Sequence, residues 1–261
     1  MPAMNSDAHV PDWTLVSLRP RGQHAPLRRA AQACGARVLA LSPWALRVRE
    51  DSASRAQLQR ALNAQRVVFS SPAAVHAAAR LLPLHGPHPG IWLAVGAGTA
   101  AALRARGAEP VVAPARMDSE GLLALPELAD LRGLEAGLVT APGGRGIIAS
   151  TLVERGARLL RADVYQRIAL PLPPRALQRL RHSPRPWVLA LSSGEALALL
   201  LAGVPQDLQA PLRQAIVVAA SARLAEQAQA AGFAQVRLAD GPLPRQLAQA
   251  AHAAIITSAP T

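Results

Sequence analysis

The chain contains one domain-sized pattern twice, and this duplication limits the folds that it can adopt. An apolar run that ends in Ser70-Ser71 is followed, after a helical stretch, by a second apolar run and by Thr99. The same order recurs at Ser192-Ser193 and Ser221, each 122 residues further along the chain. A repeat of this length is much longer than the units of solenoid proteins, so it indicates two related structural units of domain size.

Short apolar runs alternate with helical stretches in both copies. Runs such as 67–69 and 187–191 lack the alternation of polar and apolar residues that a half-exposed strand shows. Strands of this kind are typical of parallel sheets that are covered on both faces. The sequence therefore predicts an α/β fold with parallel sheets flanked by helices.

The charge balance favours a small anionic ligand over a nucleic acid. The net charge is +12, and all 28 basic residues are Arg. They are spread along the chain, and aromatic residues make up only 3% of it, so neither a basic groove nor a set of stacking platforms is indicated. We therefore expect a positively charged site for a polyanionic small molecule. A coding bias towards GC-rich triplets would also explain the surplus of Arg.

The location of the protein is predicted from three further features. No apolar stretch is long enough to cross a membrane. The first residues lack the pattern of a signal peptide, and we interpret 1–12 as a flexible tail. Cys34 is the only cysteine, so an internal disulfide is excluded. We expect a cytoplasmic protein with no membrane partner and no nucleic-acid partner.

Candidate binding residues follow the predicted strands. In open parallel α/β sheets, ligands bind beyond the carboxyl ends of the strands, where the backbone N–H groups of the next helix can hold a carboxylate or phosphate. The candidates are Arg19, Ser70, Ser71, Gly143, Gly144, Arg145, Ser192, Ser193 and Ser221. Any one of the serines could instead be an ordinary helix N-cap, although a cap requires only one residue of each pair. From the sequence alone, a surface position is favoured over a ligand role for Arg145.

Nucleotide and metal signatures are incomplete. The segment 143–146 does not complete a phosphate-binding P-loop, and 96–98 lacks the third glycine of a dinucleotide-binding turn. No His and Cys residues have the spacing of metal ligands.

Tyr165 is the only tyrosine, and its position stands out. The segment 156–165 matches 35–44 at an offset of 121 residues, which places Tyr165 in register with Trp44. Tyr165 lies where the second of two segments that we interpret as linkers begins, and Trp44 lies in the first. Tyr165 is either a packing residue at a hinge or a phenol that faces a cleft and can donate a proton.

Several dispersed motifs, taken in order, resemble those of the uroporphyrinogen-III synthase family. The resemblance covers residues 14–255 and depends on the order and spacing of the motifs together. The motifs are Leu18-Arg-Pro-Arg-Gly22, Phe69-Ser-Ser-Pro72, Ala94-Val-Gly-Ala-Gly-Thr99, Asp118-Ser-Glu-Gly-Leu-Leu123, Gly143-Gly-Arg145, Val164-Tyr165 and Ser192-Ser-Gly194.

The resemblance implies a discontinuous layout of two similar, flavodoxin-like domains with a cleft between them. Domain 1 would comprise 13–40 and 170–256, and domain 2 would comprise 46–163. The two linkers would be 41–45 and 164–169, forming a two-strand connection. Residues 257–261 would form a second flexible tail.

The resemblance also implies a function. The family are lyases that close the linear tetrapyrrole hydroxymethylbilane into uroporphyrinogen III, inverting ring D and releasing water, without a metal or organic cofactor. By this resemblance Tyr165 would assist departure of the hydroxyl group, and Thr99 would help to orient it. The candidate residues at the strand ends would bind carboxylates of the substrate. We expect a monomer, to which hydroxymethylbilane synthase could hand over the substrate directly.

A different class of function stays open on the residues alone. Two α/β domains with small and hydroxyl-bearing strand ends also suit a non-catalytic module that binds a small anion. A nucleotide-dependent transferase is a third alternative, but the sequence lacks its phosphate loop.

Overall fold

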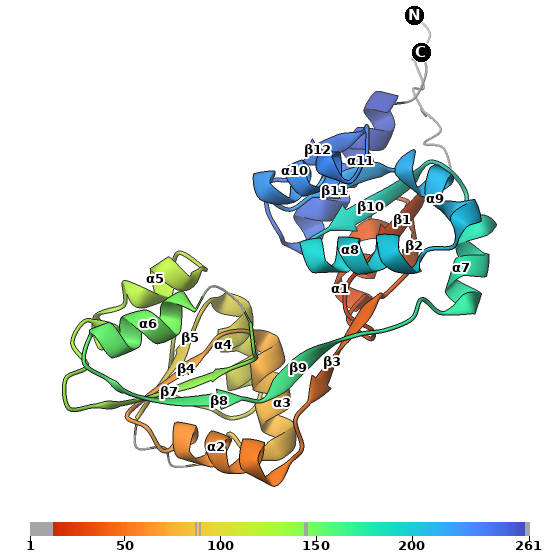
Figure 1. The fold of residues 1–261 in the computed structure, drawn as a ribbon. Coiled ribbons are helices and arrows are strands. Elements are labelled where there is room, and N and C mark those ends of the chain that lie inside the picture. The colour runs from red at the N-terminus through yellow and green to blue at the C-terminus, as the bar shows by residue number, and fades with distance from the viewer. Residues whose placement is uncertain (1–12, 87, 89, 144–145, 259–261) are drawn as a thin grey trace, which may run out of the picture. The chain divides into compact units, whose positions relative to one another are not determined.

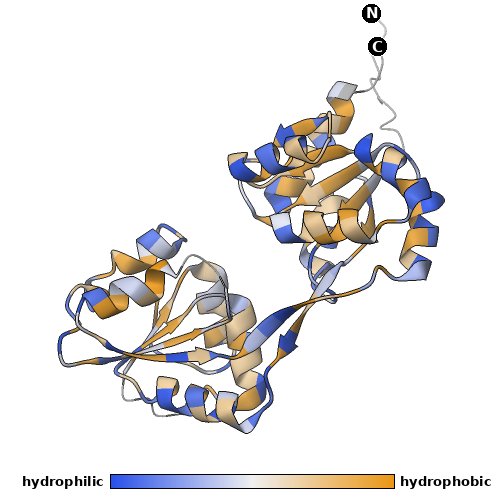
Figure 2. Cartoon of the chain, viewed as in Figure 1, coloured by the Kyte–Doolittle hydropathy of each residue, from blue (hydrophilic) through white to orange (hydrophobic). Residues whose placement is uncertain are grey.

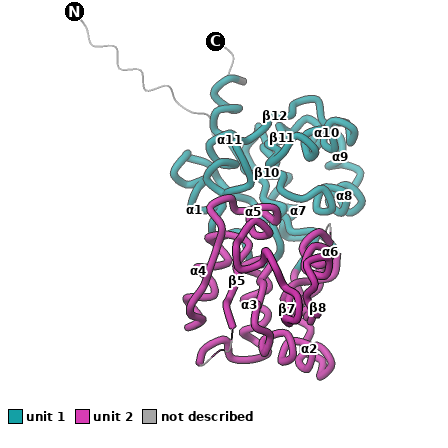
Figure 3. Tube along the Cα trace, turned by 90° about the vertical axis from the view of Figure 1, so that its left-hand side faces the viewer, with its two compact units in different colours: residues 1–45, 168–261 teal, residues 46–167 magenta. Residues whose placement is uncertain are grey.

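The structure is a computed structural model that describes residues 13–86, 88, 90–143 and 146–258 (Figure 1). The chain divides into two compact units (Figure 3). Unit 1 comprises residues 1–45 and 168–261, and unit 2 comprises residues 46–167. In the part of the chain that the structure describes, each unit contains a five-stranded parallel sheet.

The sheet of unit 1 has the strand order β12-β11-β10-β1-β2. Its strands are β1 (Thr14–Ser17), β2 (Arg37–Ala40), β10 (Trp187–Leu191), β11 (Ile216–Ala219) and β12 (Val236–Leu238). In the register of the central strands, Leu15 lies opposite Val188 on one side and Val38 on the other. The segments that form this sheet therefore come from both ends of the chain.

Helices cover both faces of this sheet. They are α1 (Ala25–Gln32), α7 (Pro174–Arg181), α8 (Gly194–Gly203), α9 (Gln206–Arg213), α10 (Ala222–Ala230) and α11 (Pro244–Ser258). Val16 packs in one hydrophobic cluster with residues of α7 to α10, whereas its neighbour Leu15 packs in another with α1 and α11. Successive strand residues point to opposite faces, which explains why the strands are apolar throughout. Figure 2 shows these strands in hydrophobic colours.

Unit 2 repeats the arrangement with the strand order β6-β5-β4-β7-β8. Its strands are β4 (Arg66–Phe69), β5 (Ile91–Ala94), β6 (Val111–Val112), β7 (Glu135–Thr140) and β8 (Arg158–Asp163). Its helices are α2 (Ser52–Leu62), α3 (Pro72–Leu81), α4 (Ala97–Arg104), α5 (Ser119–Leu123) and α6 (Ile147–Glu154), with a short 3-10 helix η1 at Pro126–Leu128. Helices α2 to α4 share a core with Phe69, whereas α5 and α6 share a core with Val68 on the opposite face.

Helix α2 lies very close to β7. A Cβ atom added at Gly137 would lie 2.0 Å from the backbone oxygen of Ala61, so the strand can accept only glycine there without moving the helix. The parallel sheets with helices on both faces confirm the predicted α/β class.

Two strands connect the units. They are β3 (Trp44–Val48) and β9 (Tyr165–Ala169), which form a two-stranded sheet. Arg49 N donates to Val164 O at 3.0 Å, and Leu170 N donates to Pro43 O at 2.8 Å.

Two features of unit 1 differ from the expectations. Helix α11 continues to Ser258, whereas we expected a flexible tail from residue 257. Buried Ile255 extends the apolar face of the helix, and Thr257 Oγ1 donates to Ala253 O at 3.0 Å. Helix α9 was not expected, and it contains Pro211. No helix among the described residues is both long enough and apolar enough to span a membrane.

Candidate functional site

A pocket of about 230 Å³ lies at the carboxyl edge of the unit 2 sheet. The ends of β4, β7 and β8 and the start of α6 contribute its lining. Its polar and charged lining residues include Ser70, Ser71, Ser119, Thr140, Arg161 and Tyr165. The pocket therefore lies where an open parallel sheet positions a ligand.

The ends of β4 and β7 are joined by their side chains. Ser70 N donates to Val139 O at 3.2 Å, which continues the pairing of the two strands by one residue. Ser70 Oγ then donates to Thr140 Oγ1 at 2.8 Å. This bond holds both half-buried hydroxyl groups at the wall of the pocket.

Ser71 caps helix α3. Its backbone is extended, with φ of −170°, and its Oγ accepts a hydrogen bond from Ala74 N at 3.1 Å. Pro72 occupies the first turn, where its missing N–H group leaves no helix hydrogen bond unmade. The capping role is therefore real, but Ser71 Oγ also lies 3.3 Å from Tyr165 Oη, which an ordinary cap does not require.

Tyr165 is packed in the core of unit 2 and also lines the pocket. Tyr165 is only 7% exposed, and it belongs to the core cluster of unit 2. Its hydroxyl group contacts Ser71, and both residues line the pocket. The packing fixes the ring, so the hydroxyl group is held in one place relative to the ends of β4 and β7.

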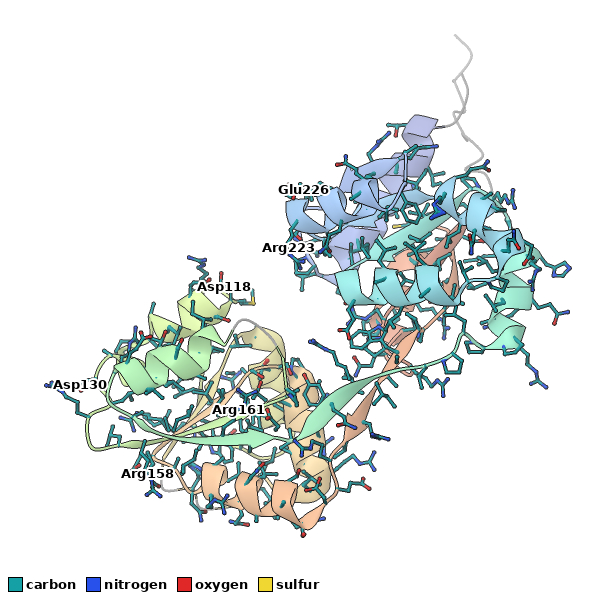
Figure 4. The ribbon with its side chains drawn as sticks, in the orientation of Figure 1. Asp118, Asp130, Arg158, Arg161, Arg223 and Glu226 are labelled. Atoms are coloured by element: carbon teal, nitrogen blue, oxygen red, sulfur yellow. The ribbon has the colours of Figure 1, made fainter. Side chains whose placement is uncertain are left out.

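Arg161 was not expected at the site. Its Nη2 donates to Ala141 O at 3.3 Å and forms an ion pair with Asp163 Oδ1 at 3.0 Å. Figure 4 labels Arg161 near β8, from which it extends. Arg161 and Asp163 are two residues apart on an edge strand and so share one face of it. That spacing was visible in the sequence, but charges on a strand usually indicate only a solvated face.

Two further residues of the pocket were also missed. Ser119 begins α5, directly after the cap residue Asp118, and Arg167 lies in β9. Neither follows a strand of the sheet directly, so a search of strand ends could not find them.

The remaining candidates of unit 2 are placed differently. Thr99 is only 2% exposed within α4 and is not among the residues that line the pocket. Gly143 lines the pocket with a φ of 87°, a conformation that favours glycine. Gly144 and Arg145 lie outside the described residues.

The candidates of unit 1 lie at the carboxyl edge of its own sheet. Half-buried Arg19 follows β1, and its Nε donates to Gln23 O at 3.0 Å. Burial lowers the pKa of the Arg19 guanidinium. Ser193 caps α8 by accepting from Ala196 N at 3.3 Å, whereas Ser192 is exposed. Ser221 is exposed at the start of α10, without a side-chain cap hydrogen bond.

A buried histidine stabilises the Arg19 turn. His24 is 8% exposed, and its Nε2 lies 2.7 Å from Ser42 Oγ, which donates to Arg19 O at 2.8 Å. Because the Ser42 hydrogen goes to this carbonyl, His24 Nε2 must be the donor to Ser42 Oγ. The other nitrogen, Nδ1, lies 2.8 Å from Ser17 Oγ and accepts a hydrogen bond from it when the ring is neutral. Burial, followed by the charges of Arg28 and Arg19, lowers the pKa of His24.

Among the described residues, no group of three or more His, Cys, Asp or Glu could hold a metal ion. The polar groups of the unit 2 pocket are instead hydroxyl groups, backbone groups and two guanidinium groups. They suit an anionic ligand that accepts hydrogen bonds.

Comparison with known proteins decides the family. Residues 20–249 match the sequence model of the uroporphyrinogen-III synthase HemD family. The chain belongs to this family. The match confirms the resemblance that the sequence motifs predicted.

Relatives in the uroporphyrinogen-III synthase family include two bacterial proteins of that name. The protein of Escherichia coli K12 is 33% identical over 152 residues, which cover 57% of this chain and 61% of the relative. The protein of Salmonella typhimurium LT2 is 32% identical over 151 residues, with the same shares of 57% and 61%. The chain thus matches about three fifths of the length of these relatives.

Solved structures share the fold. A variant of the uroporphyrinogen III synthase of Thermus thermophilus is 20% identical, with a TM-score of 0.56 over 94% of this chain and 99% of that chain. The uroporphyrinogen-III synthetase of Helicobacter pylori is 13% identical, with a TM-score of 0.57 over 92% and 98% of the two chains.

Several described residues of the motifs that resemble the uroporphyrinogen-III synthase family lie at the carboxyl edges of the two sheets. Ser70 and Ser71 follow β4 directly, and one residue separates Tyr165 from the end of β8. In unit 1, Arg19 follows β1 and Ser192 follows β10. The structure brings Ser70, Ser71, Gly143 and Tyr165 together around one pocket.

Proposed function

We propose that this protein is a uroporphyrinogen-III synthase, a lyase that converts hydroxymethylbilane into uroporphyrinogen III in tetrapyrrole biosynthesis. The observation that carries the proposal is the match of the family model to residues 20–249. The position of the only tyrosine, at a polar pocket beyond the ends of β4 and β7, supports it.

The reaction begins with loss of a hydroxyl group. Hydroxide is a poor leaving group, so the oxygen must receive a proton as its bond to carbon breaks. Tyr165, which lines the pocket, would supply this proton from its hydroxyl group, and water would leave. The resulting azafulvene is attacked by the substituted carbon of ring D, which forms a spiro intermediate.

The spiro intermediate then fragments, and ring D recloses in the opposite orientation. The final carbon–carbon bond forms at a pyrrole carbon that loses its hydrogen as a proton. That proton balances the one that left with water, so Tyr165 returns to its starting state. No oxidant or reductant is required, and holding the flexible chain in the ring-closing geometry would account for much of the rate.

Substrate binding would use carboxylate contacts. The pocket of about 230 Å³ is smaller than the ~300–1,000 Å³ of sites that enclose a drug-sized ligand, so it would hold one part of a tetrapyrrole. Arg161 can bind a carboxylate side arm there, and Ser70 with the backbone of 142–143 can add hydrogen bonds. The net charge of +12 would attract such a polyanion.

The unit 1 candidates would bind other carboxylates of the substrate. These are Arg19, Ser192, Ser193 and Ser221, which all lie at the ends of strands. Thr99 is 2% exposed, so an orienting role would act through the start of α4 rather than by contact with substrate. Gly144 and Arg145 remain candidates from the sequence alone.

The proposal includes the oligomeric state of the protein, its location and the source of its substrate. We propose a monomer in the cytoplasm that receives hydroxymethylbilane by handover from hydroxymethylbilane synthase, because the free substrate closes spontaneously to isomer I. Analytical ultracentrifugation with and without that enzyme measures both the oligomeric state and the handover complex.

The test of the activity is a separation of isomers. Hydroxymethylbilane is supplied with and without the protein, the products are oxidised, and uroporphyrins I and III are separated. We expect isomer III to replace isomer I. Unchanged isomer I from folded protein would refute the enzyme, and binding of hydroxymethylbilane without turnover would then identify an anion-binding module.

A further inference from the structure

The hydroxyl group of Ser71 makes two contacts that fix its role. Ala74 N lies 3.1 Å from Ser71 Oγ, and Tyr165 Oη lies 3.3 Å from the same atom. A backbone N–H group can only donate, so Ala74 uses one lone pair of Ser71 Oγ. The remaining question is which of the two hydroxyl groups donates to the other.

The local electrostatics favour Ser71 as the donor. Ser71 lies at the N-terminus of α3, a helix of ten residues, where the aligned peptide dipoles produce a positive potential. Accepting the hydrogen bond from Ala74 draws further electron density from Ser71 Oγ. Both effects polarise its O–H bond and strengthen it as a donor, since hydrogen bonds in a chain reinforce one another.

We propose that Ser71 donates its hydroxyl hydrogen to Tyr165 Oη and is a positioning residue rather than a carboxylate ligand. The phenol hydrogen then remains available for the departing hydroxyl group of the substrate. As that hydrogen is transferred and water leaves, the Ser71 hydrogen bond stabilises the negative charge that develops on Tyr165 Oη. The inference rests on the proposed function, because it assigns Tyr165 as the acid.

The same contact is not repeated at the equivalent cap of unit 1. Ser193 caps α8 through Ala196 N at 3.3 Å. The aromatic residue in register with Tyr165 is Trp44, whose Nε1 donates to Leu18 O at 2.8 Å. The capping function therefore does not by itself create the bond between Ser71 and Tyr165.

Kinetics of single variants separate a positioning residue from a ligand. We expect Ser71→Ala to lower kcat about tenfold, the effect of one hydrogen bond, with KM changed less than about twofold. Ser71→Thr keeps both the cap and the hydroxyl group, so it should restore kcat to within about threefold of the wild type. A rise in KM with unchanged kcat would mean that Ser71 binds a carboxylate, and it would overturn the proposal.

The loss of the helix cap needs its own controls. Ser71→Gly lacks the hydroxyl group but retains most of the cap preference, so it should lower kcat as much as Ser71→Ala with less effect on stability. Asp51 caps α2 in the same unit through Ser54 N at 2.8 Å and does not line the pocket. Asp51→Ala should therefore destabilise unit 2 and leave kcat unchanged. Equal loss of kcat in Asp51→Ala would assign the effect to stability and overturn the proposal.

A double variant tests whether Ser71 acts through Tyr165. We expect Ser71→Ala combined with Tyr165→Phe to be no slower than Tyr165→Phe alone, because the group that Ser71 positions is already absent. A further drop in kcat of about tenfold would show an independent role and would contradict the inference.

The direction of the bond can be measured without substrate. Tyr165 is the only tyrosine, so the tyrosine Fermi doublet in the Raman spectrum reports this residue alone. Its intensity ratio is low when the phenol only donates a hydrogen bond and rises when the phenol oxygen accepts one. We expect an acceptor-type ratio in the wild type, and a donor-only ratio would overturn the proposal. If isomer III is not formed while the ratio is of acceptor type, the proposed function fails and the hydrogen bond stands.

Discussion

The buried histidine of unit 1 gives a prediction whose size follows from its contacts. His24 accepts from Ser17 and donates to Ser42, so its neutral form makes two hydrogen bonds in the interior. Replacing it by Gln in His24→Gln breaks at least one bond and strains the other. At about 0.5–1.5 kcal/mol for each bond, the variant should lose about 1–3 kcal/mol of unfolding free energy at neutral or higher pH.

The stability advantage of His24 should decrease at acidic pH. Burial and the charges of Arg28 and Arg19 lower its folded-state pKa below the ordinary value of 6.5. Above that value both states are neutral, and the full advantage is present. As the pH falls towards the folded pKa, the unfolded state binds a proton first, so unfolding becomes easier. The slope for one proton is at most about 1.4 kcal/mol per pH unit, so the advantage should decrease by no more than this for each unit below 6.5, until the folded-state pKa is reached.

The measurement is denaturant unfolding followed by tryptophan fluorescence. Three of the four tryptophans, Trp13, Trp44 and Trp187, lie in unit 1. Trp92→Phe therefore removes the signal of unit 2 and avoids mixing the transitions of two units. Taking the difference between His24 and His24→Gln in this background cancels the titration of other groups. A difference that is constant between about pH 8 and about pH 5 would refute the proposed neutral histidine.

Three further results are expected. Tyr165→Phe should lower kcat by about 10²–10⁴-fold while the protein stays folded, measured by the formation of isomer III. Arg161→Gln should raise KM about tenfold through the loss of a charged contact. Arg158→Gln changes an arginine on the same strand but outside the pocket, so it should leave KM unchanged. Equal effects of the two variants on KM would indicate only long-range attraction of the substrate. Gly137→Ala should destabilise unit 2 by about 1–3 kcal/mol, because its Cβ would lie 2.0 Å from Ala61 O; an unchanged denaturation midpoint would contradict that close packing.

The fold class could be predicted because its signal is local. Strands such as β10 are buried on both faces, so every residue in them is apolar, and a short unbroken apolar run then favours a strand of a covered parallel sheet. Helix α9 was missed because Pro211 normally argues against a helix, and here a helix containing it nevertheless packs Leu208 and Leu212 into the core. The discontinuous domain layout was predicted only from the family resemblance, because the spacing of a repeat does not show in which of the two domains a segment packs.

The candidate site could be predicted where its residues lie close behind strand ends or, like Tyr165, where the repeat singles them out. Ser70 and Ser71 were found from their place behind a strand end. The burial of Thr99 could not be predicted from its position after a strand. The cap of α4 is Gly96, and the first turn of the helix therefore carries Thr99 inward. The partners of His24 are 7 and 18 residues away, so no short motif connects them. Such contacts depend on the tertiary fold.

The two copies of the repeat explain why the proposed acid belongs to one unit only. The sheets have equivalent strand orders, in which β8 precedes Tyr165 as β2 precedes Trp44. Trp44 is an N–H donor, and it donates to the carbonyl of Leu18. Tyr165 instead carries a hydroxyl group, which can accept from Ser71 and still donate its own hydrogen. An indole nitrogen cannot both accept and donate a hydrogen bond. Under the proposed function, the duplicated scaffold would therefore supply two carboxylate-binding edges but only one proton donor of this kind.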